Sequence, residues 1–135
     1  GGTIETYDVQ DLDTVKQQML KIAQSVELLF DVECRVDFAE GYPPTTNDST
    51  LYENVKSALN TTGVELHELE KPYLFGEDFS FYGQLAPSYF VFFGTKNIEK
   101  DFVYGLHTNK LNFDEEVLIL VADYYMALLN QGRDK

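Results

Sequence analysis

The sequence predicts an α/β fold, and three stretches carry that prediction. Between residues 32 and 38, apolar and charged side chains alternate, which is typical of a strand with one buried face. From residue 12 to residue 29, apolar side chains recur at helical spacing. Residues 89–93 are wholly apolar, so both faces of this segment are expected to be covered, as in an inner strand of an α/β sheet.

The N-terminal segment is expected to form a strand, a helix and a second strand. Residues 3–7 are rich in β-branched and aromatic side chains and precede the helical pattern. Asp11 is the expected helix cap. Cys34, in the second strand, is interpreted as a small core residue rather than a nucleophile. Two strands and one helix make a sheet too narrow for independent stability, so this segment needs a partner surface.

A linker is expected at residues 41–49, which are rich in Pro, Thr, Asn and Asp. Capping side chains at the end of this linker predict a helix over residues 50–60, with Gly63 beyond its end. Residues 64–69 form a short strand candidate. His67 lies in that segment and is expected to face solvent.

Two further helices are expected in the C-terminal part of the chain. Gly76-Glu77-Asp78 opens a short one, and the backbone N–H groups at a helix start stabilise carboxylates there, which is a structural explanation for Glu77. The last helix runs from residue 117 to residue 129. It carries apolar side chains on several sides, so it is either widely buried or faces a missing neighbour.

Composition limits the compartment and the classes of partner. The chain of 135 residues has 23 acidic and 10 basic side chains, a formal charge of −13 and no cluster of Lys or Arg. Nucleic acid and anionic membrane are therefore disfavoured as partners. A single cysteine cannot form an internal disulfide, and no long apolar run is present, so a reducing cytoplasm is the expected compartment.

His107 is the best candidate for a metal ligand in the sequence. It lies in the loop between the apolar run at 89–93 and the last helix, where α/β enzymes keep their chemistry. A catalytic zinc needs about three protein ligands, and a two-metal site needs more. The sequence offers one credible imidazole, and an isolated loop histidine is otherwise a surface hydrogen-bonding residue.

Five segments together resemble the C-terminal part of the M20 metallopeptidase family, in its amidohydrolase branch. This branch includes aminoacylases, hippurate hydrolases, auxin-conjugate hydrolases and N-acetyldiaminopimelate deacetylases. The segments occur in the family's order and cover nearly the whole chain: Gly2-Thr-Ile-Glu-Thr-Tyr-Asp8, Gly41-Tyr-Pro-Pro-Thr-Thr-Asn-Asp48, Leu74-Phe-Gly-Glu-Asp-Phe-Ser-Phe-Tyr82, Phe92-Phe-Gly-Thr95 and the His107 loop, Tyr104-Gly-Leu-His-Thr-Asn-Lys-Leu-Asn-Phe-Asp-Glu-Glu116.

The resemblance implies a divided protein and a divided site. Residues 1–41 would be the second half of an α/β-sandwich lid that mediates dimerisation, and residues 42–135 the C-terminal part of a zinc-peptidase-like α/β catalytic domain. His107 matches the metal ligand that this part of the family contributes. Gly76 and Glu77 match a loop beside the substrate. No catalytic residue is expected in this chain, because the general base lies in the family's N-terminal half.

The resemblance also implies the activity. A full-length parent would bind a divalent metal, with two ions of zinc, manganese or cobalt expected, and would hydrolyse the amide bond of an N-acyl amino acid with a metal-activated water. N-acetyl-diaminopimelate is an alternative substrate. The parent would be a homodimer joined through lid strands, and this chain alone would be inactive. The alternative from another class is a non-catalytic α/β module for interaction or dimerisation.

Overall fold

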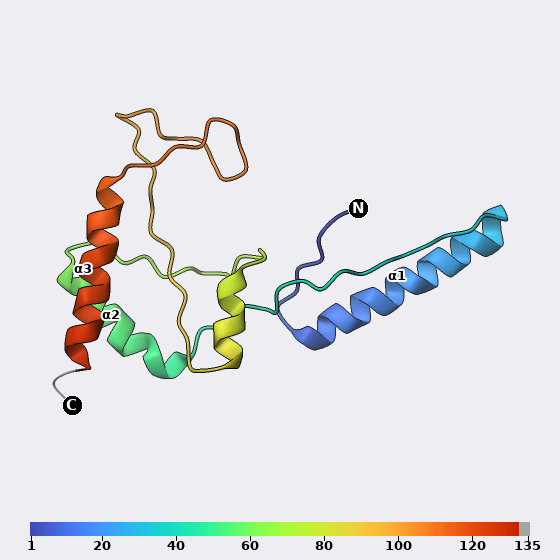
Figure 1. The fold of residues 1–135 in the computed structure, drawn as a ribbon, viewed down its shortest axis with the longest axis horizontal. Helices are drawn as coiled ribbons and strands as arrows, with labels where there is room; N and C mark the ends of the chain where they lie inside the picture. The colour runs from blue at the N-terminus through green and yellow to red at the C-terminus, as the bar shows by residue number, and fades with distance from the viewer. Residues whose placement is uncertain (133–135) are drawn as a thin grey trace. The chain divides into compact units, whose positions relative to one another are not determined.

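The computed structural model describes residues 1–132, and helices are the regular elements of that part of the chain (Figure 1). The chain divides into two compact units. One unit contains residues 1–47 and 69–88, and the other contains residues 48–68 and the described residues from 89 onward. The elements in chain order are α1 (Val9–Phe30), the 3-10 helix η1 (Ser49–Leu51), α2 (Tyr52–Thr61), the 3-10 helix η2 (Asp78–Gln84) and α3 (Glu116–Gln131).

Helix α1 confirms the helical period of its sequence but begins earlier than predicted. Its cap is Asp8, whose carboxylate accepts a hydrogen bond from the backbone N–H of Gln10 at 2.6 Å, whereas Asp11 lies in the first turn. The helix ends at Phe30, and its C-cap, Asp31, adopts a left-handed conformation. The following extended segment returns along the helix (Figure 1), and the backbone N–H of Cys34 donates to Glu27 at 2.9 Å.

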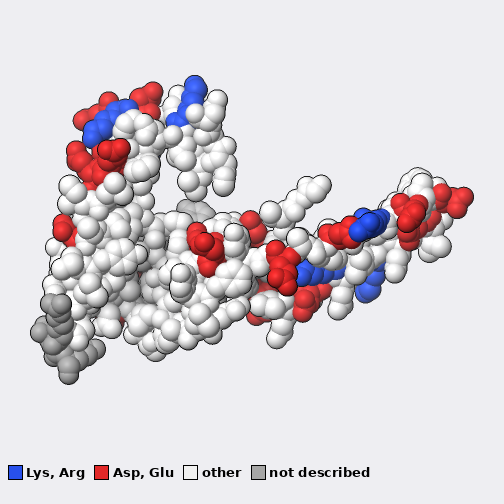
Figure 2. All heavy atoms as spheres, in the orientation of Figure 1, with Lys and Arg blue, Asp and Glu red and all other residues white. Residues whose placement is uncertain are grey.

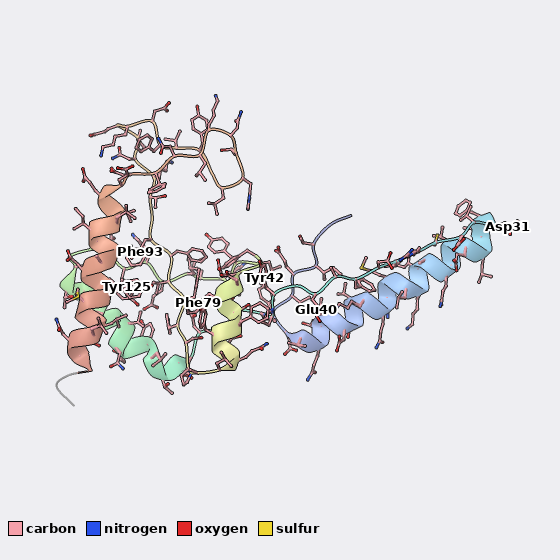
Figure 3. The ribbon with its side chains drawn as sticks, viewed as in Figure 1. Asp31, Glu40, Tyr42, Phe79, Phe93 and Tyr125 are labelled. Carbon is pink, nitrogen blue, oxygen red and sulfur yellow. The ribbon has the colours of Figure 1, made fainter. Side chains whose placement is uncertain are left out.

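The core of the second unit lies between α2 and α3. Asp48 caps the start of the first helical turn by accepting a hydrogen bond from the backbone N–H of Thr50 at 2.8 Å. Tyr124 of α3 is 3% exposed, and its ring lies 5.5 Å from that of Phe93, which Figure 3 shows beside α3. The buried apolar side chains of the described residues all belong to this cluster: Val55, Ala58, Leu59 and Tyr124.

The predicted α/β fold is wrong for this structure. In the described part of the chain, residues 3–7, 32–38, 64–69 and 89–93 are not assigned to strands, and no sheet forms. The one β-type contact there is an isolated antiparallel bridge between Asn97 and Phe102. A sheet needs a ladder of backbone hydrogen bonds between neighbouring strands, and the described segments form no such ladder. An α/β-sandwich lid therefore does not describe residues 1–41.

The apolar run at residues 89–93 is buried in part only. Alternate residues of this run, Tyr89, Val91 and Phe93, pack against the core cluster. Phe92 is 56% exposed, so the expectation that both faces are covered is also wrong. Among the described helices, none combines the length and apolar character needed to cross a lipid bilayer.

Candidate metal and substrate site

His107 lies in an exposed loop that precedes α3, as predicted, but the apolar run before that loop is not the expected buried strand. Its backbone adopts a left-handed conformation with φ of 63°, which is uncommon for a residue other than glycine. Local contacts build a compact turn around it. The hydroxyl of Thr108 donates to the carbonyl of Gly105 at 3.0 Å, and the backbone N–H of Leu111 donates to the carbonyl of Thr108 at 3.2 Å.

The carboxylate of Asp114 gathers polar groups at the base of this loop. It accepts hydrogen bonds from the side-chain amide of Asn97 at 2.6 Å and from the Nζ of Lys100 at 2.8 Å. Lys100 also lies 3.3 Å from a carboxylate oxygen of Glu116. Figure 2 shows basic and acidic atoms side by side over the loops that precede α3. None of these contacts was predicted from the sequence.

These contacts shift two ionisation equilibria in opposite directions. The hydrogen bond from Lys100, followed by that from Asn97, lowers the pKa of Asp114 below its ordinary value of 3.8. The same hydrogen bond raises the pKa of Lys100 above its ordinary value of 10.5. Both groups therefore remain charged at neutral pH.

The described residues do not form a complete metal site around His107. They contain no group of three or more His, Cys, Asp or Glu side chains placed to hold an ion. His67 is exposed and lies 3.6 Å from Glu65, as expected for a surface residue. The donor set of this segment therefore fits one imidazole ligand and no more, and a metal would need further ligands from outside it.

Gly76 and Glu77 lie in the other unit, at the start of η2. The carboxylate of Glu77 accepts a hydrogen bond from the backbone N–H of Phe79 at 3.3 Å, so the predicted capping role is confirmed. A Cβ atom on Gly76 would lie 3.0 Å from the ring of Tyr42, which Figure 3 shows beside η2. Glycine at this position lets the aromatic ring approach the backbone closely. The assignment of both residues to substrate binding stays a prediction.

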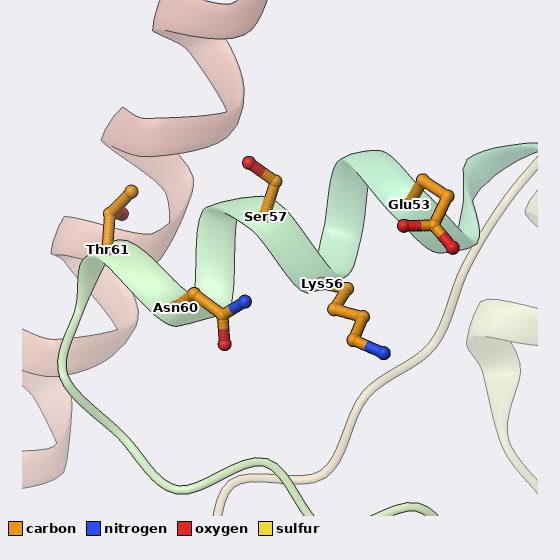
Figure 4. Close-up of a pocket in the computed structure, with 5 residues that line it drawn as sticks. All are labelled: Glu53, Lys56, Ser57, Asn60 and Thr61. Atoms are coloured by element: carbon orange, nitrogen blue, oxygen red, sulfur yellow. The ribbon is translucent and has the colours of Figure 1, made fainter.

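An open groove lies along α2 and contains none of these predicted site residues (Figure 4). It has a volume of about 390 Å³ and is lined by Glu53, Lys56, Ser57, Asn60 and Thr61. Lys56 bonds to the hydroxyl of Tyr52 at 3.1 Å, and that hydroxyl donates to Glu68. The charged side chains that line this groove are one acidic residue, Glu53, and one basic residue, Lys56. Its lining is not arranged like a metal site or a nucleophile site.

A family model described as peptidase family M20/M25/M40 matches residues 3–131, nearly the whole chain. The chain belongs to this family. That membership confirms the family inferred from the five sequence segments, while the amidohydrolase branch stays a prediction.

The M20 chain is similar to several staphylococcal proteins. It is 60% identical over 134 residues to an uncharacterized hydrolase of Staphylococcus epidermidis, covering 98% of this chain and 35% of that protein. It is 59% identical over 128 residues to one of Staphylococcus saprophyticus, covering 95% of this chain and 33% of that protein. The M20 chain thus spans about a third of the length of these relatives. No solved structure matched it.

Proposed function

We propose that a full-length protein containing this chain is a metal-dependent amidohydrolase that cleaves the amide bond of N-acyl amino acids. The match to the M20 family over residues 3–131 carries the proposal, and the hydrolase names of the relatives support its coarser form. The exposed position of His107 on a turn built by its own loop supports a role for that imidazole.

His107 would supply one ligand of a site that is completed by other parts of the full-length chain. A neutral imidazole donates a ring-nitrogen lone pair to a divalent ion, and zinc, manganese or cobalt accept such a ligand. The metal, with two ions expected, would contribute Lewis-acid activation of a water molecule. The general base would lie outside this chain. His107 would act as a metal ligand only, and no catalytic role is assigned to a residue of this segment.

Gly76 and Glu77 would contact the substrate. Because the Glu77 carboxylate already caps η2, we assign the substrate contact to the turn that these two residues form rather than to that carboxylate. An N-acyl amino acid presents a free carboxylate, which backbone N–H groups of a turn can bind. N-acetyl-diaminopimelate remains the alternative substrate, because Tyr104-Gly-Leu-His107 resembles the deacetylases that use it.

The isolated chain should hydrolyse nothing, since one imidazole ligand cannot hold a metal at ordinary concentrations. The test is an assay of the 135-residue chain with added zinc, manganese or cobalt on hippurate, N-acetyl amino acids and N-acetyl-diaminopimelate. A full-length protein that contains the chain should turn over at least one of these substrates. Chelator-sensitive turnover by the isolated chain, or none by the full-length protein, would contradict the proposal.

We also propose that the protein self-associates through the first unit. The end of α1 exposes a run of apolar side chains, with Leu28 88% and Leu29 75% exposed. Phe30 and Val32 continue this run. Large apolar side chains that gather at an exposed site are typical of an interface. The partner we propose is a second copy of the chain. Self-association is expected both of the enzyme and of the non-catalytic alternative, so it does not distinguish them.

A further inference from the structure

We infer that Asp114 is a positioning residue for His107: its carboxylate ties together the two ends of the loop that carries the imidazole. The inference rests on the proposed function, in which His107 is a metal ligand. It concerns how this chain presents that ligand, which neither the family match nor the names of the relatives address.

The first observation is that Asp114 bonds to the chain on the other side of the loop. Its two carboxylate oxygens accept from Asn97 at 2.6 Å and from Lys100 at 2.8 Å. Its backbone N–H donates to the carbonyl of Thr95 at 3.4 Å. The side chain of Asp114 is only 18% exposed, so these bonds are partly shielded from competing water.

The second observation is that Asn97 also holds the start of the loop. Its backbone exchanges two hydrogen bonds with that of Phe102, at 3.0 and 2.8 Å. The loop of residues 103–113 therefore begins and ends at one cluster of contacts, because Asn97 bonds to Phe102 before the loop and to Asp114 after it. We call this cluster, Asn97, Lys100, Phe102 and Asp114, the Asp114 hub. Fixing both ends of a loop removes conformations that an open segment would sample.

The third observation is the backbone of His107 itself. A left-handed φ of 63° at a non-glycine residue is unfavourable and persists only where the surroundings determine it. Inside the loop, contacts at Thr108 and Leu111 close the turn, and Lys110 lies over the ring of Tyr104 at 4.9 Å. The Asp114 contacts join the two ends of the loop that carries this turn, so the imidazole is presented from a fixed base.

A ligand that is fixed before the metal arrives loses less conformational freedom on binding. Opening the hub should therefore weaken metal binding without removing any ligand. The expected size is that of outer-shell losses, about 10- to 100-fold in metal affinity. A residue with a merely local structural role would leave metal affinity unchanged.

The experiment uses the full-length protein that contains this segment, with two readouts. Hydrogen exchange is measured on the metal-free protein at the backbone amides of residues 104–113, and zinc affinity is measured by calorimetric titration. Asp114→Ala should speed exchange at those amides by about tenfold or more and weaken zinc binding by about 10- to 100-fold. Lys100→Met should act in the same direction, and Lys100→Arg should restore both readouts.

Asp123→Ala is the matched control, because it removes an exposed carboxylate from α3 without touching the hub. It should change neither readout. If circular dichroism shows that Asp114→Ala does not fold, Asp114→Asn decides, since it keeps the shape and loses the charge that Lys100 pairs with. Its effect should have the same direction and a smaller size.

Three results would overturn the inference, and they differ from one another. Unchanged exchange at residues 104–113 in the Asp114 variants would show that the hub does not order the loop. Faster exchange with unchanged zinc affinity, while His107→Ala weakens zinc binding, would remove the positioning role and leave the proposed function standing. Unchanged zinc affinity in His107→Ala would overturn the proposed function, and the inference with it.

Discussion

The ring of Tyr124 meets the ring of Phe93 edge-on, with centroids 5.5 Å apart and an interplanar angle of 60°. This contact joins α3 to the extended segment at residues 89–93, and Tyr124 is the largest side chain in the buried cluster. Edge-to-face aromatic pairs contribute beyond the area that they bury, by about 0.5–1.5 kcal/mol. The fold of the second unit therefore depends strongly on one residue of α3.

Tyr124→Ala should destabilise the second unit by about 3–5 kcal/mol, because it removes a large buried ring from a small core. The matched control is Tyr125→Ala, whose side chain is exposed on the same helix and should cost less than about 1 kcal/mol. Urea unfolding followed by circular dichroism measures both. Equal losses from the two substitutions would contradict the assigned core.

Tyr124 should also make the fold sensitive to alkaline pH. Burial, followed by the neighbouring Tyr125 and Tyr89, raises its pKa above the ordinary value of 10.0. The folded protein therefore holds this proton more tightly than the unfolded chain does, so the stabilisation is present below pH 10.0 and is lost as pH rises through the raised pKa.

Unfolding free energies measured from about pH 8 to 11 test this expectation. The native protein should lose stability toward the alkaline end more steeply than Tyr124→Phe, which keeps the ring and lacks the titrating hydroxyl. Identical pH dependence in the two proteins would show that Tyr124 is not the responsible group.

Gly76→Ala should disturb the turn beside η2. The added Cβ would lie 3.0 Å from the Tyr42 ring, so that ring must shift, at a cost of about 1–3 kcal/mol. In a Gly76→Ala and Tyr42→Ala double variant, the glycine substitution should cost much less. Gly94→Ala is the control, because its Cβ would meet no atom within 4 Å. A Gly76→Ala cost that does not change with Tyr42 would refute the contact.

Local sequence patterns predicted the helices well. The predicted strands are absent from the described residues, because strand formation depends on a second segment that local patterns do not specify. The 3.6-residue period of α1 concerns neighbours three and four residues apart, which the sequence itself supplies. The alternation at residues 32–38 describes one face of a strand but cannot provide the second backbone that would pair with it.

The candidate site divides in the same way. The loop position of His107 and the cap at Glu77 depend on adjacent residues and were predicted. The bond between Lys100 and Asp114 spans 14 positions, and a lysine in a loop carries no signal of its partner. Asp114 could have been noticed as a capping side chain, since the backbone N–H of Glu116 donates to it at 3.3 Å.

Self-association should depend on the exposed end of α1. Replacing Leu28 and Leu29 with Glu places two charges in the proposed interface, where an unpaired charge is costly to bury. Sedimentation at tens of micromolar, roughly the range of weak interfaces, should show a dimer or larger species for the native chain and a monomer for the variant. Leu85→Glu changes another exposed leucine of the same unit and should leave the dimer intact. A monomeric native chain would refute the interface.

Paired histidine substitutions in the full-length protein test whether His107 binds a metal. Bound metal is measured by elemental analysis, and turnover is measured on an N-acyl amino acid. His107→Ala should lose bound metal and lower turnover by more than about 100-fold, because losing a ligand costs more than losing its outer-shell support. His67→Ala, at an exposed residue paired only with Glu65 in the described contacts, should retain both. Small and equal effects from the two substitutions would contradict the assignment of His107.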